Sequence, residues 1–355
     1  MEANHSSRFK RGKKITLADI AESLNVSKTL VSLVLNNKGD QNGISKETQR
    51  RVIEIAQRFD YKPNQLARGL RLGKTNTVGF IVADISNIFY SKLARMIEDE
   101  LNKFGYNLII CSSDEKLDKE AKMIQFLRDK HVDGLIVSST LNDSKIFNSL
   151  AEEHYPFVLI DRHFPNLQAN YVGVDNYSGS FQAVNKLISL GHKKIAILSI
   201  SPSHISSVNE RNEGYFDALK KAGIGTDNFL YCQIPFDNIK GGVDWAIKEL
   251  LRSDQEISAI YTVNNNLALH CLETLRDLQI SVPDQISLIS FDDIEFFNFV
   301  SPSISAISQP LDEIANQAVR ILMKEINHRD DDISKERVIL PAKLVLRESV
   351  RSLAK

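Results

Sequence analysis

The sequence predicts two parts of different architecture: a small domain of three helices, followed by a larger α/β region of two doubly wound parallel-sheet lobes. In residues 15–62, apolar residues recur at helical spacing in three short stretches, whereas from Thr77 onwards apolar strands alternate with helical segments. The charge divides in the same place. Residues 1–75 carry 15 Lys/Arg and 7 Asp/Glu, a net charge of +8, and the total of −1 leaves −9 for residues 76–355. A basic end favours a nucleic-acid or other anionic partner, although a solvated basic face would look the same.

Capping residues mark the starts of the three N-terminal helices. Thr16 is followed three residues later by Asp19, a capping-box pattern, and Ser27 and Ser45 precede the other two helices. Asn25 suits the left-handed turn between the first two helices. The expected buried faces are Leu17, Ile20, Ala21 and Leu24 in the first helix and Val52, Ile55, Ala56 and Phe59 in the third. Such an arrangement is typical of a helix-turn-helix domain.

The second helix has two unlike faces. At 100° per residue, Ser27, Val31, Val34 and Leu35 lie on the expected core side, and Thr29, Ser32, Leu33 and Asn36 lie opposite, with Lys28 at the margin. Hydroxyl and amide groups can contact base edges or phosphates, and a leucine can contact a thymine methyl group. These residues are therefore candidates for DNA contact, the alternative being a solvated helix face.

Basic segments flank this domain. Residues 1–14 read as a basic flexible arm. Residues 63–75 read as a linker, in which a short helix starting after Pro63 and containing Gly69 would be marginally stable alone.

Polar residues follow successive strands of the α/β region, residues 76–355. In such sheets ligands bind outside the carboxyl ends of the strands, so two facing lobes would form a cleft. Carboxylates, amides and Arg beside aromatic rings suit a polyhydroxylated or anionic ligand, although each residue alone could be a cap or a surface loop. The candidates are Asn87 with Phe89 and Tyr90, Ser113-Asp114, Asp161-Arg162, Arg211, Asn265-Asn266 and Asp292.

Several classes of protein are disfavoured. The chain contains no GxSxG, GxxxxGK[ST] or HExxH motif, so neither an enzyme nor a metal or other cofactor is expected. Three distant cysteines predict no disulfide framework. A polar N-terminus and the lack of a long apolar run predict neither a secretory signal nor a membrane span, so we expect a cytoplasmic protein.

At this point the sequence resembles the LacI/GalR (lactose-repressor/galactose-repressor) family from about Ile15 to Ser349. "TLADIAESLNVSKTLVSLVLN" resembles the family's helix-turn-helix signature, and "PNQLARGLR" its hinge helix. "DGLIV", "LISLGHKKIAIL", "VPDQISLISFDD" and "SISAISQP" resemble core motifs in the same order. The resemblance implies a homodimeric transcription regulator, expected to be a repressor. Its helix-turn-helix headpiece would be joined to a periplasmic-binding-protein-like core that senses a small molecule, often a sugar.

The resemblance also implies roles for individual residues. Lys28 and Thr29 match base-reading positions, and Ser27, Ser32 and Asn36 match positions that contact phosphates or bases. Leu70 matches the hinge residue that wedges into the minor groove of a pseudo-palindromic operator. The other DNA-binding candidates in the hinge are Asn64, Ala67, Arg68 and Arg71. In the core, the implied effector contacts are Asp161, Arg211, Asn265 and Asp292, with Phe89, Tyr90 and Phe236 for ring stacking.

The chain departs from the family pattern at four positions. Leu30 and Leu33 replace the usual Thr and Arg or His, so the operator should differ from the familiar one. Ile88 replaces the usual Pro, and Asn266 replaces the usual Asp with the loss of one anionic acceptor, so the identity of the effector does not carry over from any relative. An inducer and a co-repressor would use the same architecture.

Rival interpretations are a solute-binding protein for transport, a sugar-metabolising enzyme and a non-specific DNA-binding protein. The implied lobe boundaries are 76–174 plus 304–337 for the first lobe (N-lobe) and 175–303 plus 338–355 for the second (C-lobe). No heptad tail follows Arg347, which favours a dimer.

Overall fold

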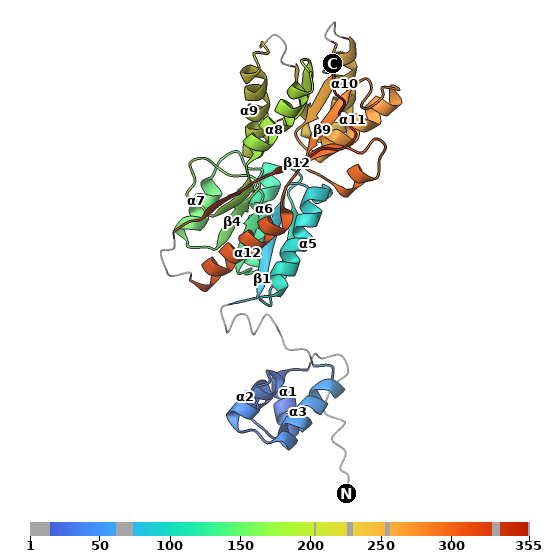
Figure 1. The fold of residues 1–355 in the computed structure, drawn as a ribbon. Coiled ribbons are helices and arrows are strands. Elements are labelled where there is room, and N and C mark those ends of the chain that lie inside the picture. Colours follow the sequence, from blue (N-terminus) through green and yellow to red (C-terminus); the bar gives the residue numbers. More distant parts are fainter. Residues whose placement is uncertain are drawn as a thin grey trace. The chain divides into compact units, whose positions relative to one another are not determined.

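The computed structural model describes residues 15–61, 74–201, 204–225, 230–252, 256–328 and 334–353. It divides into two compact units, Met1–Thr75, the headpiece, and Asn76–Lys355, the core (Figure 1). The arm predicted for residues 1–14, and the hinge predicted for residues 63–75 apart from Lys74 and Thr75, lie outside the described residues.

The described part of the headpiece contains three α-helices, whose starts were predicted correctly. Thr16 and Asp19 form the capping box, in which the Thr16 amide donates to the Asp19 carboxylate (2.7 Å) and the Asp19 amide donates to the Thr16 hydroxyl (3.3 Å). The Ser27 hydroxyl accepts from the Leu30 amide, and the Ser45 hydroxyl caps the third helix in the same way. The bounds are α1 (Leu17–Leu24), α2 (Lys28–Leu35), the 3₁₀ helix η1 (Asp40–Asn42) and α3 (Lys46–Arg58).

The three helices share a small apolar core, formed by Ile20, Ala21, Val31, Val34, Val52 and Ala56. One part of the expected core face of α2 was wrong. Ser27 is exposed, because the N-cap residue must reach the free amides at the helix end. Leu35 is half-buried and packs against this core, as expected.

The first lobe of the core contains a six-stranded sheet in which every strand pair is parallel. The strand order is β11-β5-β4-β3-β1-β2, so the order reverses beside β1. Its strands are β1 (Thr77–Val82), β2 (Asn107–Ser112), β3 (Gly134–Val137), β4 (Phe157–Ile160), β5 (Tyr171–Val174) and β11 (Arg337–Leu340). Its helices are α5 (Ile88–Asn102), α6 (Leu117–Asp129), α7 (Lys145–Glu152) and α12 (Leu311–Asn327).

Alternation along the strands explains why both faces of this sheet are covered. Phe80 of β1 packs in the cluster that contains residues of α5 and α12, whereas the next residue, Ile81, packs in the cluster that contains residues of α6 and α7. A parallel strand buried on both sides reads as a continuous apolar run, as the segment "TVGFIV" does.

The second lobe repeats this plan. Its strand order is β12-β10-β9-β8-β6-β7, again with a reversal, here beside β6. Only the β10–β12 pair is antiparallel among the described strands. The strands are β6 (Ile195–Ser201), β7 (Leu230–Pro235), β8 (Ala259–Thr262), β9 (Ser287–Phe291), β10 (Ser305–Ser308) and β12 (Lys343–Val345). The helices are α8 (Asn176–Ser189), α9 (Ser206–Lys221), α10 (Ile239–Arg252) and α11 (Asn265–Asp277), with the 3₁₀ turns η3 (Phe236–Asn238) and η4 (Glu295–Asn298). The architecture confirms the predicted fold class.

The strand pairing corrects the expected lobe boundaries. We expected 304–337 in the N-lobe, but β10 pairs with β9 and so belongs to the C-lobe sheet. We expected 338–355 in the C-lobe, but β11 pairs with β5 in the N-lobe sheet along its whole length. The chain therefore passes between the lobes near residues 175, 309 and 342, because hydrogen bonding to a neighbouring strand decides the sheet to which a short apolar strand belongs.

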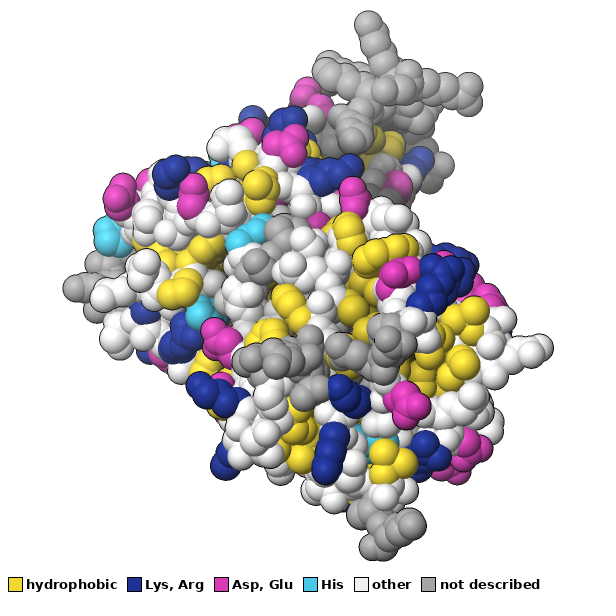
Figure 2. All heavy atoms as spheres, turned by 90° about the horizontal axis from the view of Figure 1, so that it is seen from above, with side chains coloured by type: hydrophobic (Ala, Val, Ile, Leu, Met, Phe, Trp, Pro, Cys, Tyr) yellow, Lys and Arg dark blue, Asp and Glu magenta, His cyan; other side chains and the backbone are white. Residues whose placement is uncertain are grey.

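The surface of the core intersperses charges of opposite sign. Figure 2 shows Lys and Arg side chains close to Asp and Glu, with hydrophobic side chains between them. Arg95, for example, lies 2.8 Å from Asp99, and Arg320 lies 2.6 Å from Glu336. The acidic core is therefore not the part of the chain that would attract a polyanion.

Candidate functional site

Helix α2 presents its predicted DNA-contacting residues in two environments. Ser27, Lys28 and Thr29, at the start of the helix, are exposed, whereas Ser32 and Asn36 are half-buried. The Asn36 amide donates to the Ser32 carbonyl oxygen at 2.6 Å, so one of its donors is already used within the helix. Lys28 and Thr29 are therefore the polar side chains of α2 that are best placed to reach a partner.

The three-helix part of the headpiece is electrically balanced. Residues 15–61 hold six Lys/Arg and six Asp/Glu, so the net charge of +8 comes entirely from the segments on either side. The predicted DNA contacts Asn64, Ala67, Arg68, Leu70 and Arg71 fall in one of these segments and lie outside the described residues. Non-specific affinity for DNA comes from neutralised phosphates, and the excess of basic residues that it needs is in these flanking segments.

Two aspartates face one another across the two lobes. Asp161 directly follows β4 of the N-lobe, and Asp292 directly follows β9 of the C-lobe. Both have left-handed backbones, with φ of +61° and +67°. Non-glycine residues rarely adopt this conformation, and they concentrate at functional sites. The repeated geometry places one carboxylate at the carboxyl end of each sheet.

Arg211 of α9 lies between these carboxylates. Its side chain is almost fully buried, 3.8 Å from Asp161 and 3.7 Å from Asp292. Its Nε donates to Asn176 (2.9 Å) and its Nη1 to the Val263 carbonyl (2.8 Å), and the guanidinium stacks on Phe291 at 3.8 Å. These bonds fix the guanidinium while leaving gaps beyond hydrogen-bond length to both aspartates.

The ionisation of Asp292 reflects this environment. Burial raises the pKa of Asp292, while Arg211 and a hydrogen bond from Gln309 oppose that rise. A buried carboxylate is tolerated here because a cation and an amide lie beside it.

The N-lobe wall is a network around Asp161. The Tyr90 hydroxyl donates to Asp161 at 2.9 Å, and burial raises the pKa of Tyr90 far above its ordinary value, so it remains a hydrogen-bond donor. Arg162 forms a two-pronged bond with Glu115, with Nη1 2.8 Å from Oε2. Burial alone would lower the pKa of Arg162, but Tyr90, Glu115 and Asp161 outweigh it, and the pKa is raised.

Direct contacts join the lobes around the cleft. The Asn265 amide donates to the Asn87 side chain at 3.1 Å, and Lys92 forms an ion pair with Glu295 at 2.9 Å. At the other rim, the His163 amide donates to the Ser206 hydroxyl at 2.9 Å. Any motion that separates the lobes must break these bonds.

The chain matches known proteins along nearly its whole length. A model of bacterial regulatory proteins of the lacI family matches residues 16–64, and a model of a periplasmic binding protein-like domain matches residues 184–350. The HTH-type transcriptional regulator DegA of Bacillus subtilis (strain 168) is 32% identical over 96% of this chain and 99% of the relative. The chain belongs to the LacI family of bacterial regulatory proteins. It is accordingly a DNA-binding transcription regulator, and its relatives are regulators rather than enzymes.

Among the solved structures that resemble this LacI-family protein, two contain a bound sugar named in their description. One is a LacI family transcriptional regulator from Enterococcus faecium with bound ribose, which is 28% identical, covers 78% of this chain and 99% of its own, and has a TM-score of 0.69. The other is the transcriptional regulator CelR in complex with cellobiose, which is 25% identical, covers 94% of this chain and 99% of its own, and also has a TM-score of 0.69.

Most of the predicted effector-binding residues line a cavity between the lobes. Its volume is about 40 Å³, and nine of the twelve candidates line it: Asn87, Phe89, Tyr90, Asp161, Arg162, Arg211, Phe236, Asn266 and Asp292. Ser113, Asp114 and Asn265 do not, and Asp114 is bonded to Ser112 and Lys119 instead. Ser113 is fully buried with its hydroxyl 3.5 Å from the Ala83 carbonyl, and Asn265 lies behind the wall, bonded to Asn87.

Several lining residues were missed by the sequence prediction. Asp84, Glu115 and Gln309 line the cavity, together with the apolar residues Ile200, Ile205 and Val208. Asp84 and Glu115 follow β1 and β2, so the rule of strand ends would have found them if it had been applied two or three residues further. Gln309 sits where the chain passes between lobes, which no local pattern indicates.

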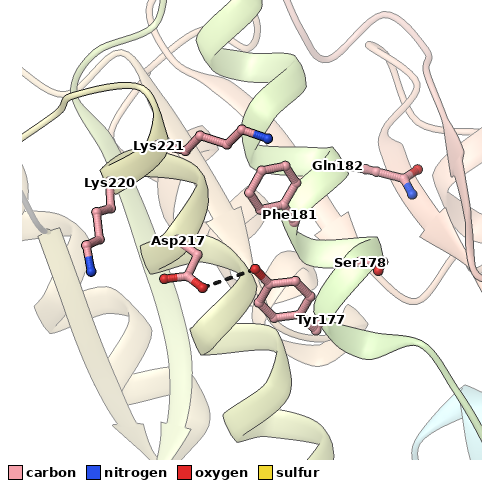
Figure 3. Close-up of a pocket in the computed structure, with 7 residues that line it drawn as sticks. All are labelled: Tyr177, Ser178, Phe181, Gln182, Asp217, Lys220 and Lys221. Atoms are coloured by element: carbon pink, nitrogen blue, oxygen red, sulfur yellow. Dashed lines mark hydrogen bonds between the residues drawn. The ribbon is translucent and has the colours of Figure 1, made fainter.

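A larger cavity of about 570 Å³ lies elsewhere, on the surface between α8 and α9. Figure 3 shows the Tyr177 and Phe181 rings turned towards α9, while Lys220 points away from them. The groups that face one another are already paired, because the Tyr177 hydroxyl donates to Asp217 and Lys221 lies 5.3 Å above Phe181. This surface joins two helices, and its size does not make it the better ligand site.

Neither a metal site nor a membrane-spanning helix is found in the described residues. No group of three or more His, Cys, Asp or Glu side chains there is placed to hold a metal ion. No helix of that part of the chain is long and apolar enough to cross a membrane.

Proposed function

We propose that this protein is a cytoplasmic, homodimeric repressor that binds a pseudo-palindromic operator, and that a sugar bound between the core lobes controls its affinity for DNA. The observation that carries the proposal is the arrangement of Arg211 between Asp161 and Asp292, one carboxylate from each lobe. The affinity of a ligand held by both carboxylates would depend on the relative position of the lobes.

The chemistry of the cleft fits a polyhydroxylated ligand. The gaps of 3.7–3.8 Å from Arg211 to the two aspartates exceed a hydrogen bond, so sugar hydroxyl groups could bridge them. One residue that lines the cleft, Arg162, has a buried Nε with no hydrogen-bond partner within the described residues. This atom is a donor, and a sugar hydroxyl oxygen could accept from it. The structural neighbours with ribose and cellobiose support the same class of ligand.

Binding would be coupled to lobe movement because the cleft is nearly closed. A cavity of about 40 Å³ is far smaller than the roughly 300 Å³ of a small ligand site. A sugar could enter only if contacts such as Asn87–Asn265 opened, and it would favour whichever lobe arrangement bound it better. By reciprocity, the same ligand would change the affinity for DNA.

On DNA, we propose that Lys28 and Thr29 read base edges in the major groove, with Leu33 against a thymine methyl group. Ser27, Ser32 and Asn36 would contact the backbone or adjacent bases, and Leu70 would wedge into the minor groove at the centre of the site. The support is the exposure of the start of α2 together with the basic segments that flank the headpiece.

The first experiment is selection of binding sites from a random DNA pool with the full-length protein at a stated salt concentration. We expect a pseudo-palindrome with a flexible pyrimidine–purine step at its centre. The selected site then serves in a second assay, in which ribose, cellobiose and other sugars are screened for a change in operator affinity by fluorescence anisotropy. If no site is enriched, with or without added sugars, the protein is not a sequence-specific repressor.

A further inference from the structure

The two guanidinium groups that line the cleft are already neutralised by carboxylates. Arg162 is held by both oxygens of Glu115, and its Nε lies 3.6 Å from Asp161. Arg211 lies between Asp161 and Asp292. Together with Asp84, four carboxylates and two guanidiniums line the cavity, a formal excess of two negative charges.

Glu115 binds the guanidinium of Arg162, which would otherwise be the cation of the cleft best suited to an anionic ligand. A guanidinium offers a planar pair of N–H donors that matches a carboxylate or phosphate, and Glu115 takes that pair from Arg162. Both side chains are about nine-tenths buried, so water screens the pair weakly. Glu115 is also held in place, because its left-handed backbone (φ +54°) donates its amide to the Ala83 carbonyl at 3.1 Å.

We propose that the cleft selects an uncharged sugar over a phosphorylated or carboxylated one, and that Glu115 is the residue that sets this specificity. This inference rests on the proposed function of the cleft as a sugar site. An anionic group entering the cavity would meet the excess of carboxylates, because the positive charges of Arg162 and Arg211 are already balanced by those carboxylates. Hydroxyl groups meet no such penalty, because carboxylates accept from them and guanidiniums donate to them.

Replacing Glu115 should change the ligand class rather than abolish the site. In Glu115→Gln the shape is kept but the negative charge is lost, and Glu115→Ala removes the competitor for Arg162 altogether. Either variant leaves Arg162 with unpaired N–H donors at the cavity. The matched control is Glu153→Gln, which removes the acid of another Glu–Arg pair, with Arg128, at the surface and away from the cleft residues.

The experiment uses the full-length protein with its selected operator and compares uncharged and anionic versions of the same sugars. The probes are glucose and glucose 6-phosphate, ribose and ribose 5-phosphate, and glucuronate, with cellobiose as a further uncharged sugar. Ligand affinity is measured by calorimetry and by the change in operator affinity. Thermal melting of each variant shows whether it is folded.

We expect the wild-type protein to bind at least one uncharged sugar at least tenfold more tightly than its anionic counterpart. In Glu115→Gln or Glu115→Ala that preference should shrink at least tenfold, and in Glu153→Gln it should not change. If the wild-type protein binds a sugar phosphate or glucuronate as tightly as the uncharged sugar, the inferred preference for uncharged ligands is wrong. The proposed function as a sugar-controlled regulator would still stand. An unchanged preference in both folded Glu115 variants overturns the role of Glu115. If the protein binds none of the probes, the proposal that the cleft is a sugar site is wrong as well. Operator binding is measured separately and does not depend on this result.

Discussion

Arg211→Ala removes the cation on which the buried carboxylates of the cleft depend. Arg211 donates two hydrogen bonds, to Asn176 and to the Val263 carbonyl, and lies within 4 Å of Asp161 and Asp292. Removing one partner of a buried ion pair costs about 3–5 kcal/mol, because the remaining charge is left uncompensated. For a core of 280 residues, Asn76–Lys355, this corresponds to a fall of about 5–9 °C in the Tm of the core transition.

The loss of stability in this variant should depend on pH. Burial already raises the pKa of Asp292, and Arg211 is the main group opposing that rise. Without Arg211 the pKa of Asp292 in the folded state rises further above its unfolded value of about 3.8, so the folded protein binds a proton more readily than the unfolded chain. A raised folded-state pKa contributes stability at low pH that is lost as the pH rises through it. The Tm deficit should therefore be smaller at pH 5 than at pH 8.

The assay is calorimetric or circular-dichroism melting of wild type, Arg211→Ala and the control Arg95→Ala at several pH values. Arg95 forms exposed ion pairs with Glu98 and Asp99, and its removal should cost at most about 1 kcal/mol. We also expect Arg211→Ala to bind the operator but not to respond to a sugar. The proposed network would be refuted if Arg211→Ala had the same Tm as Arg95→Ala at every pH, or if its operator affinity responded normally to sugar.

Four further predictions test the headpiece and the core packing. Ser27→Ala should destabilise the headpiece by about 1 kcal/mol through loss of the α2 cap, measured by melting. Lys28→Ala should leave the melting unchanged, and it should lower by about 1 the steepness with which the logarithm of operator affinity falls with the logarithm of salt concentration. Leu70→Ala should weaken operator binding more than binding to random DNA, as judged by parallel titrations. Gly214→Ala should destabilise the core by about 1–3 kcal/mol, because the added Cβ would lie 2.4 Å from the Tyr177 carbonyl oxygen, whereas Gly225→Ala, with open space around its Cβ, should melt like wild type.

Each of these predictions can fail separately. A Lys28 variant with an unchanged salt slope would remove Lys28 from the DNA interface. Equal losses on operator and random DNA would contradict the wedge role of Leu70. If the Gly214 and Gly225 variants melt alike, α8 and α9 do not approach as closely as the structure places them.

Local sequence determined the elements of both units. The capping box of Thr16 and Asp19, and the caps Ser27 and Ser45, are interactions between residues three apart, so the pattern of residue types was enough to place the helix starts. The alternation of apolar strands and helices likewise predicted the two lobes, and the rule of strand ends predicted Asp161 and Asp292. These features follow from neighbouring residues, whose geometry is set by the backbone itself.

The tertiary structure decided which of these residues meet. The Glu115–Arg162 pair and the contact between Asn87 and Asn265 join residues far apart in the chain, and no local pattern distinguishes them from other polar residues. Sheet pairing, not composition, assigned β10 and β11 to their lobes. Ser113 follows its strand as Asp161 does, yet it is buried beneath the cleft rather than lining it. Sequence specifies the chemistry available at each strand end, but the twist and pairing of whole sheets decide which ends converge.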